Sequence, residues 1–166
     1  LGKLSAGLAH ELNNPASAAG RASSQLLDAL GELQGATVDL TRAGIDHELW
    51  ASLVEWDRAL QRGSEGPETL SAIDASDREE ELMDWLDDHG VADGWDFAPT
   101  LVAVGIRAQD LDKIASTLPR HALANAIGWL CKSFTTQDLA EAVVKSSRSI
   151  SRLVDAAKSF SYMDQD

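Results

Sequence analysis

The sequence predicts an all-α fold, in which two long helices form a homodimeric four-helix bundle and a small helical subdomain is inserted between them. The first and last segments each carry apolar or small residues at alternating steps of three and four. This stride of about 3.5 residues is typical of helices that pack in a bundle. The middle segment combines short helical patterns, brief turns and few runs of β-branched residues, which favours helices there as well.

The first bundle helix is expected within residues 1–35, where the pattern breaks at Gly35. At about 100° per residue, His10 lies roughly opposite the centre of the apolar stripe, so its imidazole is expected in water. Asn14 lies one turn further along the same face, and Glu11 lies near enough to reach a ring nitrogen. The stripe consists of Leu1, Ser5, Leu8, Leu12, Pro15, Ala19, Ala22, Leu26, Ala29 and Leu33.

His10, Glu11 and Asn14 form a polar cluster with a reactive composition. An exposed neutral imidazole is a competent nucleophile, and an adjacent carboxylate can hold the other ring N–H and support the developing positive charge. The Asn14 amide can position a water or a phosphoryl oxygen. A lone surface histidine is more often only a solvated residue, but these neighbours favour a reactive one. A zinc-protease pattern is excluded because Asn14 stands where the second histidine would be.

The middle segment, 36–134, is expected to fold as a separate acidic unit with its own core. It contains 19 Asp or Glu against 8 Lys or Arg, a net charge of −11 out of −13 for the whole chain. All five tryptophans lie in it, and they favour either a packed core or an aromatic ligand surface. Helices are expected near 46–60, 77–89 with a capping box at Ser76 and Glu79, 93–105 capped by Asp93 or Asp96, 108–116 and 119–133.

Charge and composition exclude several classes of function. The acidity disfavours nucleic acid and anionic membrane surfaces as partners. No apolar run approaches a membrane span, and no signal peptide is apparent. The single cysteine, Cys131, is expected to be buried, which fits a cytoplasmic protein, and four scattered histidines give little support for metal binding. Both ends interrupt helical patterns, so the chain is expected to be a piece of a longer protein.

The second bundle helix is expected over residues 135–166, starting at Thr135 or Thr136 with Asp138 as capping partner. Its polar run of Arg148, Ser149, Ser151 and Arg152 is most simply a solvated face, with phosphate handling by an arginine as the alternative. The two stripes favour a homodimer, because a single hairpin would leave both half covered. The second stripe consists of Leu139, Ala142, Val143, Ser146, Ile150, Leu153, Ala157 and Phe160.

The stretch Gly7-Leu8-Ala9-His10-Glu11-Leu12-Asn13-Asn14-Pro15 resembles the H-box of sensor histidine kinases, in its His-Glu-x-x-Asn-Pro form. The resemblance implies that His10 is the phospho-accepting histidine and Glu11 its acid–base partner. It implies that Asn14 acts in phosphatase or phosphotransfer geometry and that Pro15 kinks the helix. The segment from Ser149 to Gln165 resembles the end of the second helix in some soluble members.

In that family, the dimerisation and phosphotransfer domain is a hairpin of two long helices, and two hairpins form a four-helix bundle. The resemblance therefore implies a homodimer, a response-regulator receiver domain as partner, and ATP with Mg bound by a separate ATP-binding domain. No glycine-rich nucleotide loop occurs in this chain. The chain departs from the family pattern because about 100 residues replace the short turn between the helices.

Two functions therefore remain open from the sequence. The first is the dimerisation and phosphoacceptor domain of a two-component histidine kinase, an enzyme fragment that passes a phosphoryl group to a response-regulator aspartate. The alternative is a non-catalytic helical sensor or scaffold module with a degenerate kinase core. The complete set of His10, Glu11, Asn14 and Pro15 favours the first.

Overall fold

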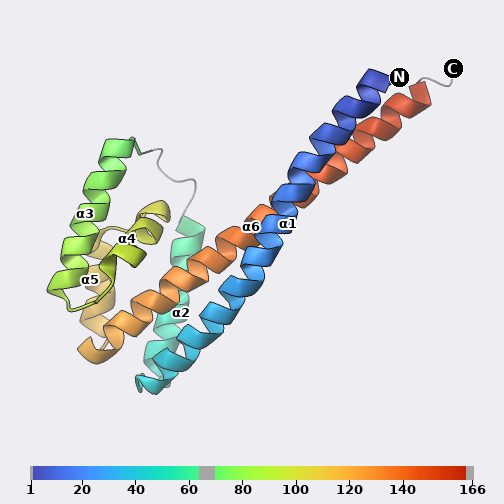
Figure 1. Ribbon diagram of the computed structural model, residues 1–166. Coiled ribbons are helices and arrows are strands. Elements are labelled where there is room, and N and C mark those ends of the chain that lie inside the picture. The colour runs from blue at the N-terminus through green and yellow to red at the C-terminus, as the bar shows by residue number, and fades with distance from the viewer. Residues whose placement is uncertain (1, 64–69, 164–166) are drawn as a thin grey trace. The chain divides into compact units, whose positions relative to one another are not determined.

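A computed structural model describes residues 2–63 and 70–163, and the side chains of residues 7–62 and 70–159. These residues form helices and connecting turns, with no strand among them, so the predicted all-α class is confirmed. No helix in the described ranges has the length and apolar character to cross a membrane. The helices are α1 (Gly2–Arg42), α2 (His47–Gly63), α3 (Ala72–Asp88), α4 (Gly94–Ala103), α5 (Ala108–Thr117) and α6 (Arg120–Met163) (Figure 1).

The chain divides into two compact units. Unit 1 comprises Leu1–Leu30 and Thr136–Asp166, and unit 2 comprises Gly31–Thr135. The predicted insert, 36–134, falls inside unit 2. The long helices α1 and α6 each contribute one end to each unit.

In unit 1, α1 and α6 lie side by side and run in opposite directions (Figure 1). Ala22 and Ala29 are buried at their contact, and small side chains of this kind let two helix backbones approach closely. The described members of both predicted stripes are buried or half-buried, whereas the side chains of Leu1, Ser5 and Phe160 lie outside the described residues. The 3.5-residue stride therefore identifies the contact faces of both helices.

Unit 2 has a core to which all six helices contribute. Its fully buried side chains come from α1 (Leu40), α2 (Leu53), α3 (Leu82, Leu86), α4 (Leu101), the following turn (Ile106), α5 (Leu111) and α6 (Ile127, Leu130). A side-chain hydrogen bond and an ion pair connect α1 to α6 within this unit. The Trp129 indole N–H donates to the Thr37 hydroxyl at 3.0 Å, and the Lys132 ammonium lies 2.8 Å from the Glu32 carboxylate.

The predicted end of the first helix at Gly35 is wrong, because α1 continues to Arg42. A helical glycine costs about 1 kcal/mol relative to alanine. Here the residues that follow it compensate. Leu40 is fully buried in unit 2, and the Thr37 hydroxyl accepts from the Trp129 indole N–H of α6 at 3.0 Å. The tertiary contacts of the last turns thus outweigh the local cost at Gly35.

The predicted start of the last helix at Thr135 or Thr136 is also wrong, because α6 begins at Arg120 and runs without interruption to Met163. The Thr135 hydroxyl does not cap a new helix. It donates to the Cys131 carbonyl one turn earlier, at 3.0 Å, a bond compatible with a helix interior. The expected helices 119–133 and 135–166 are therefore one helix.

The predicted capping box at Ser76 and Glu79 is wrong as well. Helix α3 starts five residues earlier than expected, and its N-cap is Ser71, whose hydroxyl accepts from the Asp74 N–H at 3.1 Å. Asp93 does precede α4, but in a left-handed conformation (φ 62°) and without a side-chain cap bond.

Four of the five tryptophans contribute to the core of unit 2. Trp85 and Trp129 are buried, and Trp50 and Trp56 are half-buried against the same cluster. The rings of Trp50 and Trp129 meet edge to face, with centroids 5.2 Å apart. Trp95 differs, because it is 69% exposed at the start of α4.

Candidate functional site

His10, Glu11 and Asn14 all project into solvent from the unit 1 part of α1. Leu8 and Leu12, on the opposite side of the same turns, are half-buried towards α6, so the packing of the stripe fixes the outward direction of His10. The His10 side chain is exposed, and its ring makes no hydrogen bond with any described residue. The structure therefore places the three predicted residues on one exposed stretch of a regular helix.

Pro15 lies in the interior of α1, which continues through it. Proline has no backbone N–H, so the Glu11 carbonyl, which a residue four positions later would bind, lacks this partner. That carbonyl is therefore an additional hydrogen-bond acceptor one residue after His10. Any opening of the helix at this point acts directly on the backbone that carries the His10–Glu11 pair.

The other three histidines differ from His10 in their surroundings. His89 has Nδ1 2.7 Å from the Trp85 carbonyl and stacks on the Trp85 ring. His121 has Nε2 3.0 Å from the Ala43 carbonyl. His47 is exposed in the first turn of α2, but Ala51 occupies the position four residues on, where His10 has an amide. Only His10 thus combines an unbound ring with neighbouring carboxylate and amide groups among the described histidines.

Among the described residues, the one cysteine lacks the exposure that His10 has. The Cys131 thiol is buried in unit 2, and burial raises its pKa to about 12, so the nucleophilic thiolate is scarce at neutral pH. Among the described residues, no three His, Cys, Asp or Glu side chains are grouped closely enough to hold a metal ion.

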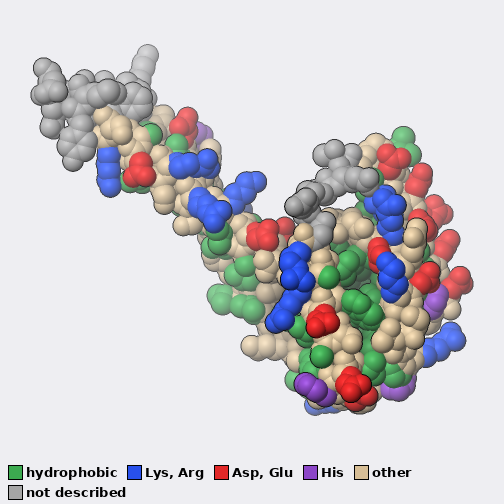
Figure 2. Space-filling model, turned by 180° about the vertical axis from the view of Figure 1, so that it is seen from behind, with side chains coloured by type: hydrophobic (Ala, Val, Ile, Leu, Met, Phe, Trp, Pro, Cys, Tyr) green, Lys and Arg blue, Asp and Glu red, His purple; other side chains and the backbone are tan. Residues whose placement is uncertain are grey.

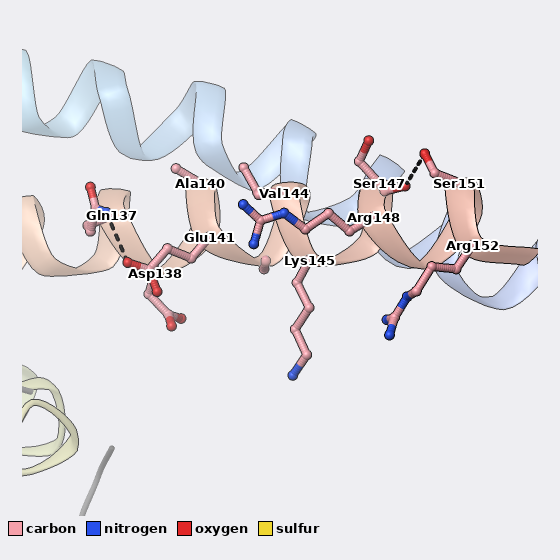
Figure 3. A pocket seen from close by; sticks show the side chains of 11 residues that line it. Gln137, Asp138, Ala140, Glu141, Val144, Lys145, Ser147, Arg148, Ser151 and Arg152 are labelled. Atoms are coloured by element: carbon pink, nitrogen blue, oxygen red, sulfur yellow. Dashed lines mark hydrogen bonds between the residues drawn. The ribbon is translucent and has the colours of Figure 1, made fainter. Parts of the chain in front are cut away.

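A second polar feature of unit 1 lies on the exposed side of α6. An open hollow of about 1180 Å³ runs along this helix between Gln137 and Arg152. In Figure 3, Lys145 and Arg152 point to the same side of α6, and the Arg148 side chain extends along the helix towards Val144. Sequence reasoning noted Arg148 and Arg152 but missed Lys145. The signal that would have included it is the spacing of seven residues to Arg152, which places both on one face.

The acidic side chains concentrate on a different element. Figure 2 shows Asp and Glu side chains gathered along one edge of unit 2. The outer face of α3 accounts for this edge, because its inner face buries Leu82, Trp85 and Leu86 and leaves the carboxylates in water. The exposed carboxylates of α3 are Asp74, Asp77, Glu80, Glu81, Asp84, Asp87 and Asp88.

Comparison with known proteins found no matching family model, no similar curated protein and no similar solved structure. The interpretation of the site therefore rests on its own residues and their chemistry.

Proposed function

We propose that this chain is the dimerisation and phosphoacceptor domain of a cytoplasmic two-component histidine kinase, with His10 as the phosphorylated residue. The observation that carries the proposal is the exposed, unbound His10 ring on a helix whose next residues are Glu11, Asn14 and Pro15. A nucleophilic imidazole must be accessible and neutral, and it needs a base for the proton that it sheds.

The proposed chemistry assigns one task to each residue. A ring nitrogen of His10 attacks the γ-phosphorus of ATP, the bond from this phosphorus to the bridging oxygen breaks, and ADP leaves. The proton on the other ring nitrogen passes to Glu11, which also stabilises the positive ring before the proton departs. Asn14 then orients the phosphoryl group or a water when the group moves on to a response-regulator aspartate or is hydrolysed. ATP and Mg are bound by a separate ATP-binding domain in the intact protein.

Phosphorylation of the chain joined to an ATP-binding domain tests this proposal. Phosphohistidine is stable in base and labile in acid, which distinguishes it from phosphoserine. His10→Gln should abolish base-stable label, whereas His47→Gln, at another exposed histidine, should retain it. Glu11→Gln should slow labelling by about 10- to 1000-fold, on the scale of a lost acid–base partner. Asn14→Ala should leave accumulation nearly intact and change loss of the label.

Normal base-stable labelling of His10→Gln would refute the proposal and move the acceptor to His47, His89 or His121. Absence of label from the unmodified chain, with an ATP-binding domain that labels a known acceptor, would favour the non-catalytic scaffold.

We further propose that the functional form is a homodimer built from unit 1. Large apolar side chains remain exposed on its two helices, namely Leu27 (72%) and Leu30 on α1 and Val154 on α6. A second hairpin would cover them and close a four-helix bundle.

Light scattering should then give about twice the chain mass of 17.8 kDa. Leu27→Glu together with Leu30→Glu should shift the mass towards the monomer. Ile73→Glu is the matched control, because Ile73 in unit 2 is equally exposed at 73%. An unmodified chain that remains monomeric at micromolar concentration would contradict the bundle.

A further inference from the structure

We propose that the cationic face of α6, formed by Lys145, Arg148 and Arg152, binds an acidic surface of a folded protein partner. This proposal does not depend on the role of His10. The three residues line the hollow on α6 together with small residues such as Ala140 and Ser147 (Figure 3). Lys145 and Arg152 are seven residues apart, about 10 Å along the helix, so the three cations are spread along α6 and not gathered at a single point.

The three cations have no partner of their own among the described residues. Glu141 stands four residues before Lys145, the favourable arrangement for a helical ion pair, yet it instead accepts from the Gln137 amide at 3.0 Å. The Ser151 hydroxyl donates to the Ser147 carbonyl at 3.2 Å and is turned away from the arginines (Figure 3). The positive charge of this face is therefore not neutralised within the chain.

The concentration of charge distinguishes this face from the rest of unit 1. Six Lys or Arg occur in residues 1–30 and 136–166, and three of them lie within eight residues on one side of α6. At the other end of the hollow, the carboxylates of Asp138 and Glu141 make the surface negatively charged. A partner would therefore place its carboxylates over Lys145–Arg152 and keep its acidic groups away from the Gln137 end.

The carboxylates that flank the cationic face favour some anionic partners over others. A DNA duplex or an anionic membrane extends far beyond a 10 Å stretch of cations, and the exposed carboxylates of Asp138, Glu141 and Asp155 flank this stretch on α6. Repulsion within the Debye length of about 8 Å opposes such extended polyanions. A compact acidic patch, with carboxylates about one helical turn apart, can meet the three cations without covering the flanking carboxylates. Charge complementarity thus favours a protein surface.

Binding of a synthetic helical peptide with glutamates one turn apart tests the proposal on the full chain. The peptide should bind, and a matched peptide with glutamine at the same positions should bind at least about tenfold more weakly. Replacing Lys145, Arg148 and Arg152 together by glutamine, a good helix former, should weaken binding of the glutamate peptide by a similar factor. Lys158→Gln, an exposed cation on the same helix outside the hollow, should change it less than about twofold.

Circular dichroism of the triple variant checks that its helices are intact. If the triple variant loses helix, Lys145→Gln alone replaces it, and this single variant should lose part of the binding of the glutamate peptide. Equal binding of the two peptides, or an unchanged triple variant, would overturn the proposal. Binding to duplex DNA or phosphatidylserine vesicles that the triple variant loses would overturn it too, because the face would then recognise phosphate.

Discussion

Asp57 is the one buried charged or polar residue of the described core, and its replacement tests how unit 2 tolerates a carboxylate in its interior. It lies on α2 and is 7% exposed. The Gln61 amide donates to both its carboxylate oxygens at 3.0 Å. Burial raises the pKa of the Asp57 carboxyl above its ordinary value of 3.8, while hydrogen bonds from Ser133 and Gln61 and the nearby Arg58 charge oppose the rise.

The direction of this pKa shift fixes the pH dependence of stability. A carboxyl with a higher pKa in the folded than in the unfolded state weakens the fold while it is ionised. The cost is fully present above the folded-state pKa and is relieved as the pH falls through that pKa towards 3.8. Asp57→Asn removes the cost at all pH values. It should therefore leave the free energy of unfolding at pH 7 unchanged or raise it by about 1 kcal/mol.

Asp57→Ala should have the opposite effect, because the Ser133 hydroxyl and the Gln61 amide lose the acceptor that they share. The expected loss is about 1–3 kcal/mol. Urea unfolding between pH 7 and pH 4, followed by tryptophan fluorescence, measures all three proteins. The unmodified chain should gain stability relative to Asp57→Asn as the pH falls. A constant difference, or a relative loss on acidification, would refute the reasoning.

Three further predictions concern local features. Cys131 should react with a thiol reagent at pH 8 far more slowly in the native chain than in urea, since its pKa is about 12; equal rates would contradict its burial. Ser71→Ala should lower the free energy of unfolding by about 1 kcal/mol through loss of the α3 cap, and no change would assign the cap elsewhere. Gly105→Ala should lower the free energy of unfolding by about 1–2 kcal/mol, because φ at this position is +78°. The added Cβ would meet no other atom, so this backbone strain is the whole expected cost, and a stabilised variant would contradict the backbone conformation.

The helical class and the contact faces of unit 1 were predictable because they depend on side-chain periodicity alone. The positions where helices start and stop were less predictable, because they also depend on distant contacts. Gly35 is a local helix breaker, but the burial of Leu40 a few residues later keeps α1 helical. Thr135 is a good capping residue, yet its hydroxyl binds back to Cys131 inside α6. Sequence rules for caps describe the local preference and contain no term for such packing.

The candidate site shows the same division between local and distant information. The exposure of His10 follows from its angle to the Leu8 and Leu12 stripe, which the sequence contains. The lack of an ion pair at Lys145 does not follow from the sequence, because Glu141 stands at a favourable spacing and only the structure shows its bond to Gln137. The spacing along a helix shows which ion pairs can form. Which of them do form depends on the other donors that compete for each carboxylate.

The unequal burial of the tryptophans makes the chain its own optical reporter. Trp85 and Trp129 are buried in the core of unit 2, whereas Trp95 is exposed at the start of α4. A collisional quencher such as acrylamide should therefore remove the red-shifted emission of Trp95 first and reach the core indoles only after unfolding. Any molecule that covers the α4 end of unit 2 should shield Trp95 and shift its emission to shorter wavelength. Titration of the unlabelled chain can thus detect a ligand of the inserted unit whose chemistry is not known beforehand.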